Sequence, residues 1–174
     1  MIVCVRPVRA EELDAAMNVI EEGRAAIAKL NIDQWQSGAP GRKDIEKDIS
    51  LNRLYGVYDE IGLCAVGAMC GGVEPCYDGI QGKWLKDGAY LTVHRVACLA
   101  RARRSGAAQA LIAEAEKLAR AQGLDSVRVD THRGNVVMQR FMEKTGFTNC
   151  GIVDYTPDIV GDPLRIGYEK LLME

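Results

Sequence analysis

A run of arginines and small residues directly after an apolar stretch is the clearest chemical feature of this chain. Residues 96–108 read V-A-C-L-A-R-A-R-R-S-G-A-A, and an alanine-rich stretch with helical spacing follows. Amide groups at a helix N-terminus attract anions, because the helix dipole and the unpaired N–H groups both point toward the ligand. Small residues at Ser105, Gly106, Ala107 and Ala108 let a phosphate approach the backbone. The pattern therefore predicts a site for a phosphorylated cofactor.

Two common phosphate-binding loops are missing from the sequence. There is no G-x-x-x-x-G-K-[ST] run, and no G-x-G-x-x-G opens the first strand–helix unit. The arginine-bearing loop instead follows the fourth predicted strand, and a plain pyrophosphate turn does not need arginines. A nucleotide-binding α/β protein of another kind stays open, and titration with CoA, ATP and NAD would separate these ligands through the stability that each adds.

Apolar runs and helical spacing predict the elements that position this loop. Strands are expected at Ile2–Val5, Leu54–Tyr58, Leu63–Cys70, Tyr90–Cys98, Ser126–Asp130, Thr148–Val153 and Leu164–Leu171. Helices are expected at Ala10–Leu30, Asp44–Leu51, Ser105–Gln122 and Asn135–Lys144. The strands on either side of the third helix should be parallel, because the crossover between them is right-handed. The order predicts an α/β fold with a mixed sheet and helices on both faces.

Two segments receive more specific expectations. Strict alternation along the fourth strand would place one set of side chains on a common face: Tyr90, Thr92, His94, Val96 and Cys98. Gly71–Gly88 is predicted to be irregular, and loops of that length are uncommon unless they are functional or mobile. A mobile lid is one interpretation of this segment.

Composition bounds the class of protein. With 48% hydrophobic and 26% charged residues, the 174-residue chain is typical of a folded globular protein. The net charge of −2 gives no support to a nucleic-acid partner, and no apolar run is long enough to span a bilayer. The start of the chain lacks the layout of a secretory signal, so a cytoplasmic protein is expected. The six cysteines form no C-x-x-C pair, which favours buried reduced thiols and no metal site.

Two blocks of the sequence resemble a known family. Residues 103–108, R-R-S-G-A-A, resemble the R-x-x-G-x-G/A pyrophosphate loop of the GNAT superfamily of acyl-CoA N-acyltransferases. Residues 130–147, D-T-H-R-G-N-V-V-M-Q-R-F-M-E-K-T-G-F, are similar to that family's second block, in which an Asn opens a helix leading to a Gly-Phe pair. The segment D-Q-W-Q-S-G also looks like bacterial members. The blocks stand in the family's order and at its usual separation.

The resemblance implies a fold and a cofactor. It implies one GNAT domain over residues 1–174, with a mostly antiparallel sheet in which one parallel strand pair splays to admit acetyl-CoA. Pantetheine carries two amides and would pair with the strand end at Val96, Ala97 and Cys98. The amides of Arg104, Ser105, Gly106, Ala107 and Ala108 would hold the pyrophosphate, with charge added by Arg103 and Arg101. Asn135 matches a cofactor-contacting Asn and suits a helix N-cap.

The chemistry of amine acetylation suggests roles for further residues. His94 is the best base candidate, since it lies on the strand that forms the cleft, although a packed or substrate-orienting histidine stays open. A backbone N–H near Val96 or Ala97 is the natural oxyanion donor. Many family members place a proton-donating tyrosine where this chain has Met142. Tyr155 or Tyr168 would then serve, or the thiolate would leave unaided.

Other side chains receive structural or acceptor-side expectations. His132 is expected to be a surface or loop residue, and Cys98 a core residue rather than a nucleophile. The acceptor side is expected to include Trp35 and Tyr90, together with Gln34 and Tyr55.

The leading interpretation is an acetyl-CoA-dependent N-acetyltransferase that acts by direct attack of a primary amine. The acceptor would be a small metabolite, an amino acid, a drug or a protein N-terminus. The Met142 departure instead favours a non-catalytic acyl-CoA-binding or sensor domain of the same fold. A homodimer through the terminal strands would be ordinary for this fold, and no membrane or nucleic-acid partner is expected.

Overall fold

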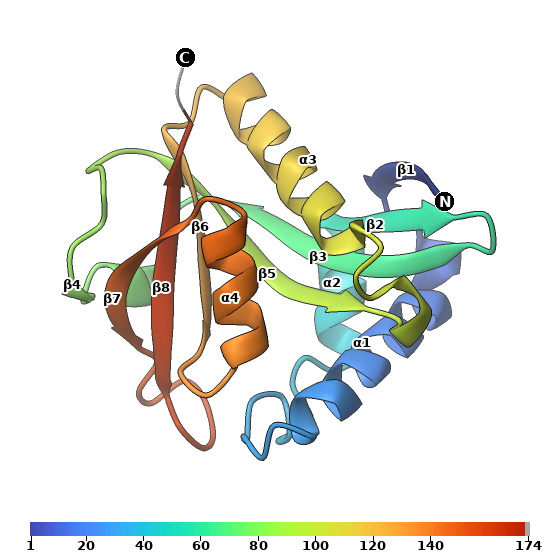
Figure 1. The fold of residues 1–174 in the computed structure, drawn as a ribbon, viewed down its shortest axis with the longest axis horizontal. Coiled ribbons are helices and arrows are strands. Elements are labelled where there is room, and N and C mark those ends of the chain that lie inside the picture. Colours follow the sequence, from blue (N-terminus) through green and yellow to red (C-terminus); the bar gives the residue numbers. More distant parts are fainter. Residues whose placement is uncertain (173–174) are drawn as a thin grey trace.

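A computed structural model describes residues 1–172, and Figure 1 shows its fold. The helices are α1 (Leu13–Ala28), α2 (Arg42–Ser50), α3 (Ala107–Ala121) and α4 (Val136–Lys144), with short 3-10 turns η1 (Ala10–Glu12), η2 (Pro75–Tyr77) and η3 (Ala100–Ala102). The strands are β1 (Ile2–Pro7), β2 (Leu54–Asp59), β3 (Leu63–Gly71), β4 (Gln81–Gly82), β5 (Tyr90–Cys98), β6 (Ser126–His132), β7 (Thr148–Asp154) and β8 (Leu164–Leu171).

One mixed sheet contains all the strands. Its order is β1-β2-β3-β5-β6-β8-β7-β4, and every neighbouring pair is antiparallel except β5 and β6. The expected mixed sheet and parallel pair are therefore confirmed. The predicted helices and long strands are all present, with bounds that differ by a few residues at their ends.

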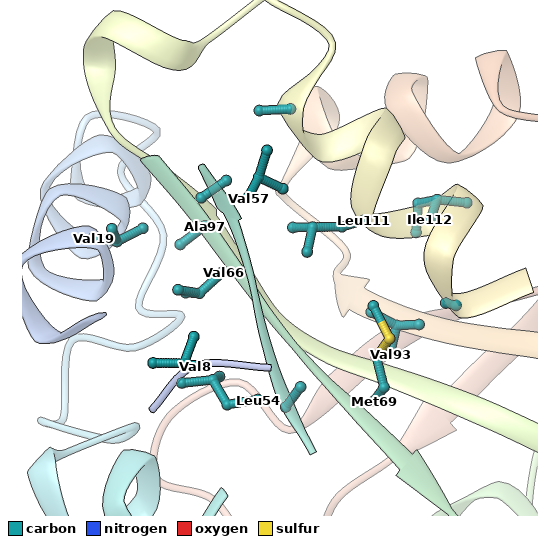
Figure 2. Packing of buried hydrophobic residues seen from close by; sticks show 14 of the residues in the cluster. Val8, Val19, Leu54, Val57, Val66, Met69, Val93, Ala97, Leu111 and Ile112 are labelled. Atoms are coloured by element: carbon teal, nitrogen blue, oxygen red, sulfur yellow. The ribbon is translucent and has the colours of Figure 1, made fainter. Parts of the chain in front are cut away.

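Helices cover both faces of the sheet. In Figure 2, Val19 of α1 lies on one side of the central strands, and Leu111 and Ile112 of α3 lie on the other. α1 packs against β3 and β5, while α3 packs against β2, β3, β5 and β6. Val66 and Ala97 face α1, whereas Met69 and Val93 face α3. The apolar side chains of the central strands thus form a core on each face.

The spacing of small and apolar residues explains how closely the helices approach. In α3, Leu111, Ile112, Ala115 and Ala119 are buried at helical spacing. In α1, a Cβ added to Gly23 would lie 2.9 Å from the Cβ of Ala97. Glycine at this position lets α1 lie directly on β5, next to the residues that are expected to bind the cofactor.

The segment between β3 and β5 is folded onto the sheet rather than loose. Tyr77 is fully buried, and its ring lies 5.0 Å from that of Trp84. Gln81 and Gly82 pair with β7, and the Glu169 carboxylate accepts a hydrogen bond from Leu85 N–H. The aromatic side chains of this segment thus pack in a small core of their own. The mobile-lid interpretation concerns motion and stays a prediction.

The cysteines are only partly as expected. All six are free thiols, and Cys64 and Cys150 are buried, whereas Cys4 on the edge strand β1 is exposed.

Within residues 1–172, every helix is too short or too polar to span a bilayer.

Candidate functional site

Strands β5 and β6 pair over only three residues and then part. Tyr90, Leu91 and Thr92 pair with Ser126, Val127 and Arg128, and no pair follows within the described strands. β3 stays paired with β5 as far as Cys98, and β8 stays paired with β6 as far as His132. Figure 1 shows β5 running away from β6 beyond this point. The expected splay is present, and it leaves one edge of β5 without a partner strand.

A bulge in β5 changes which residues share a face. The register with β3 shifts between Ala68↔His94 and Val66↔Ala97, and Arg95 has a φ of 57°. An extra residue in one strand reverses the alternation beyond it. The expectation that Val96 and Cys98 share a face with Tyr90, Thr92 and His94 is therefore wrong.

Contacts on the two faces establish this reversal. Ala97 lies against Gly23 of α1, whereas Val96 lies near Gly67 and Leu111 on the α3 side. Cys98 also lies on the α3 side, where its sulfur accepts the Ala108 amide.

The free edge of β5 offers backbone groups at defined positions. Leu99 N–H donates to Cys64 C=O over 2.9 Å, and Ala97 pairs with Val66. Neighbouring strand residues direct their backbone groups to opposite edges, so those of Val96 and Cys98 point toward the gap. Of the two expected oxyanion donors, Val96 has the amide on the open side and Ala97 has it on the β3 side.

His94 lies beside the splay between two carboxylates from distant segments. Its Nε2 is 3.1 Å from Glu74 Oε2, and its Nδ1 is 3.9 Å from Asp130 Oδ2. The imidazole side chain is 22% exposed, so a small molecule can reach it. The hydrogen bond to His94 lowers the pKa of Glu74, which keeps that carboxyl ionised at neutral pH.

Two tyrosines complete this cluster through Asp130. Tyr77 and Tyr155 each donate a hydroxyl hydrogen bond to Asp130 Oδ2, over 2.7 Å and 2.8 Å. Burial raises the pKa of both phenols, so both keep their protons at neutral pH. Sequence reasoning did not predict Glu74, Tyr77 or Asp130 as site residues. The one available signal was the placement of Asp130 at the open end of an apolar strand.

The loop before α3 carries amide groups without partners. Arg104 and Gly106 have φ values of 63° and 90°, and successive amides in such turns form anion-binding concavities. Within residues 1–172, the N–H groups of Arg104, Gly106 and Ala107 donate no hydrogen bond. The Ser105 amide instead turns back to Ala102 C=O over 3.3 Å. The free amides and the start of α3 fit a diphosphate.

The three arginines of this loop differ in their contacts. Arg101 forms an ion pair with Asp59 and also donates to Leu63 C=O. Arg103 donates to Glu22 C=O over 3.2 Å. The side chain of Arg104 is exposed and has no partner within the described part of the chain. Arg104 is therefore the arginine that is free to meet an anion without breaking another contact.

Asn135 caps α4 as expected, and its side chain also forms a hydrogen bond with the loop after α1. Its side chain accepts the Met138 amide over 3.1 Å and donates to Gln34 Oε1 over 3.0 Å. Trp35, next to Gln34, has a φ of 66° and packs on α1 at Gly23. The loop after α1 is thereby joined to the start of α4.

Two other expected acceptor-side residues have structural contacts. The ring of Tyr90 lies under the guanidinium of Arg128, 3.9 Å away, and its hydroxyl accepts the Glu74 amide. It thus supports the backbone of the residue that meets His94. Tyr55 lies away from His94, in a groove on the α3 side that Leu118 and Gln122 also line.

His132 is buried, so the expectation of a surface or loop position is wrong. It is the last residue of β6 and is 5% exposed, with Nε2 lying 3.1 Å from Asp33 Oδ1 and 3.4 Å from Asp162 Oδ2.

Cys98 is a core-facing thiol as expected, and burial raises its pKa to about 11. Met142 is fully buried. Among residues 1–172, no three His, Cys, Asp or Glu side chains gather so as to hold a metal ion.

Comparisons with known proteins point to one family. A family model described as "Acetyltransferase (GNAT) family" matches residues 24–147. A GNAT family acetyltransferase from Streptococcus agalactiae is 36% identical, with a TM-score of 0.86 over 98% of this chain and 96% of that chain. No curated protein matches the chain.

More distant structures share the fold. PaiA N-acetyltransferase from Thermoplasma acidophilum, in complex with coenzyme A, has a TM-score of 0.69 at 18% identity, over 98% of this chain and 99% of that one. The ribosomal-protein-S18-alanine N-acetyltransferase from Escherichia coli has a TM-score of 0.68 at 14% identity, over 100% of this chain and 96% of that one.

Proposed function

The chain belongs to the acetyltransferase (GNAT) family, and from that premise we propose that it transfers the acetyl group of acetyl-CoA to the nitrogen of a primary amine. The observation that carries the proposal is the position of His94, where β5 and β6 part and between the carboxylates of Glu74 and Asp130. A reachable imidazole at the mouth of a splayed strand pair is suited to take a proton from an amine bound there.

The residues that would hold acetyl-CoA come from β5 and the start of α3. The free amides of Arg104, Gly106 and Ala107 suit its diphosphate, and the Arg104 side chain adds a positive charge without losing another partner. The outward backbone groups of Val96 and Cys98 suit the amides of pantetheine, as an added strand would. When bound, acetyl-CoA supplies an acetyl group that is activated as a thioester.

The contacts of His94 assign a role to each ring nitrogen. The ionised Glu74 carboxylate can only accept a hydrogen bond, so Nε2 of His94 must carry a proton and donate it to Glu74. The lone pair of the neutral imidazole is therefore on Nδ1. Nδ1 faces Asp130 across 3.9 Å, which is too long for a direct hydrogen bond. An acceptor amine would donate its N–H to Nδ1, and the imidazolium that forms would lie between two carboxylates that stabilise it.

The leaving thiolate has no proton donor at the α4 position that many family members fill with a tyrosine, because this chain has Met142 there. That side chain is fully buried in the main core, so it leaves the cleft without a donor from α4. The phenols of Tyr77 and Tyr155 are committed to Asp130. Thiolates are weak bases, and unaided departure is consistent with this arrangement. The alternative of a non-catalytic acyl-CoA-binding or sensor domain rests on this missing donor, and the amine assay below separates the two functions.

The test is an acetylation assay with acetyl-CoA and a panel of primary amines, in which release of free CoA thiol is followed. We expect the His94→Gln variant to lose a factor of about 10² to 10⁴ in kcat. Its CoA-induced rise in melting temperature should equal that of the wild type, because His94 is outside the diphosphate loop. Thiol release at the wild-type rate by His94→Gln would contradict the assignment of the base. A wild-type protein that binds CoA but acetylates no amine would contradict the function.

A further inference from the structure

Arg165 on β8 is a nearly buried cation without an ion-pair partner. It is 9% exposed, and its Nη1 donates to the carbonyl oxygens of Asp162 and Leu164 over 2.7 Å and 3.0 Å. These two bonds fix the plane of the guanidinium. Across residues 1–172, Nε and Nη2 donate to no acceptor, and no carboxylate forms an ion pair with the group. The edge of the guanidinium that carries Nε and Nη2 is therefore free of protein partners.

The nearby carboxylates are all engaged by other donors. Asp162 pairs with Arg133 at 2.6 Å, and Asp33 lies 3.1 Å from His132. Asp130 accepts the hydroxyls of Tyr77 and Tyr155. They act on the charge of Arg165 from a distance and do not occupy its free edge.

The free edge is open to a ligand. Among the described residues, the fully enclosed side-chain atoms that lack partners belong to Arg24, Thr92 and His132. The two unpaired nitrogens of Arg165 are not among them, so solvent reaches this edge although the rest of the side chain is covered. The edge is therefore not sealed inside the core.

The sheet register places Arg165 on the same face as the His94 cluster. Asp130 pairs with Gly167, and His132 pairs with Arg165. Paired residues and residues two apart along a strand share a face, so Asp130 and Arg165 project to the same side. Two strand residues span about 7 Å. Since Asp130 also faces His94 Nδ1, a compound a few bonds long can extend from the imidazole to the guanidinium.

The chemistry of the free edge favours a carboxylate. Nε and Nη2 form a planar fork with parallel N–H bonds, which matches the two oxygens of a carboxylate. A phosphate dianion would meet more repulsion from the nearby carboxylates of Asp130, Asp33 and Asp162 than a singly charged carboxylate would. Glu74 and Asp130 lie at the His94 end and attract the ammonium group at the other end of an amino acid.

We propose that Arg165 binds a carboxylate of the acceptor, so that the substrate of this chain is a small amine that also carries a carboxylate, as an amino acid does. This inference rests on the proposed function, because it assigns the amine end to His94. It defines Arg165 as a substrate-binding residue that fixes the far end of the acceptor.

Matched substrates test the proposal in the wild-type protein. We would measure kcat/KM for free amino acids, for their methyl esters and for the corresponding amines that lack the carboxylate. Hydrogen bonds to a charged group predict a preference of about tenfold to a hundredfold for the free amino acids. Equal values across the three sets would overturn the proposal while leaving the acetyltransferase function intact.

Variants locate the effect. Arg165→Gln should raise KM for amino acids by about tenfold or more and leave KM for carboxylate-free amines unchanged. Arg165→Lys keeps the charge but loses the fork, so it should recover only part of the affinity. Arg133→Gln is the matched control, since Arg133 is 57% exposed and pairs with the same Asp162 loop. A CoA-induced thermal shift of wild-type size would establish that each variant is folded.

The outcomes separate this inference from the function on which it rests. If Arg165→Gln does not fold, the comparison of substrates in the wild-type protein still decides. If the wild-type protein acetylates none of the three sets of amines, the proposed function fails. Calorimetric titration of the CoA-loaded protein then tests Arg165 directly. Tighter binding of amino acids than of their methyl esters would support the carboxylate site, and equal binding would overturn it.

Discussion

Arg95 Nη1 donates to Asp48 Oδ2 over 2.7 Å, and this contact joins the bulge in β5 to helix α2. Arg95 has the left-handed φ of 57° that creates the bulge, and it follows His94 directly. Asp48 is fully buried and also accepts Arg53 Nε over 2.7 Å. The strained backbone beside the candidate base is therefore held by a buried carboxylate from another part of the chain.

Asp48→Asn should weaken both the fold and the site. Removing one partner of a buried ion pair is strongly destabilising, and the two arginines remain 28% and 24% exposed, so we expect a loss of about 3 kcal/mol, at the low end of the usual range. Urea unfolding measures this loss. Asp14→Asn is the control, because Asp14 is 86% exposed and pairs with Arg42 at the surface. An equal loss in both variants would contradict a special role for Asp48.

Gly106→Ala should weaken CoA binding through the backbone. Gly106 has a φ of 90° that alanine adopts only under strain. The added Cβ atom would lie 3.9 Å from its nearest neighbour, Ile2 Cδ1, so no steric clash contributes. The free amides of the loop should therefore lose their alignment. Calorimetric titration with CoA measures the effect.

Gly123→Ala is the matched control for that experiment. Gly123 has a φ of 69° with open space around it, and it lies at the opposite end of α3. Both variants should lose about 1 to 2 kcal/mol of stability. Only the Gly106 change should reduce the affinity for CoA. If Gly106→Ala and Gly123→Ala bind CoA equally well, the result would count against a diphosphate site at this loop.

Replacing Glu74 by glutamine should alter the pH dependence of stability. The hydrogen bond to His94 lowers the folded-state pKa of Glu74 below the ordinary value of 4.5, so the carboxylate stabilises the fold. That contribution is fully present above about pH 4.5 and is lost as the pH falls through the folded-state pKa. Unfolding measured from pH 7 to pH 3 should therefore bring wild type and Glu74→Gln together at the acid end. A difference in unfolding free energy between wild type and Glu74→Gln that stays constant over that range would rule out this effect of the Glu74 pKa. Glu60→Gln, at the surface, is the control for removing a carboxylate elsewhere.

Thiol labelling should distinguish Cys98 from Cys4. Burial raises the pKa of Cys98 to about 11, and reactivity requires the thiolate, so Cys98 should resist iodoacetamide at pH 8. Cys4 is exposed on β1 and should react first. Mass spectrometry of the labelled protein identifies the modified residue. Rapid labelling of Cys98, with loss of acetylation, would instead revive it as a nucleophile.

Local patterns were enough to predict the four helices and the long strands, but not β4 or the 3-10 turns. Helical spacing of Leu111, Ile112 and Ala115, with glycines at both ends, predicts α3 within a few residues, and Asn135 predicts the start of α4 through its capping bond. These signals depend on neighbours in the sequence. The unpaired amides before α3 follow from the same local information, because every helix leaves its first N–H groups without partners.

Long-range contacts decided the rest of the candidate site. Glu74 and Asp130 are 56 residues apart in numbering. Both lie beside His94 only because the sheet order places β6 beside β5 and the segment with Tyr77 folds over it. The bulge at Arg95 reversed the expected faces of Val96 and Cys98, and the Arg95 side chain is held by a carboxylate on α2. His132 was misjudged for the same reason, since its burial comes from Asp33 and Asp162.

The sequence by itself determined the order of the elements, the position of the arginine-bearing loop before α3 and the family to which both point. Only the tertiary structure decided which charged groups surround His94 and which leave the edge of Arg165 open. The physical reason is that helices and strands are specified by contacts between near neighbours, whereas the pairing of charges across a sheet depends on its register and on a single inserted residue.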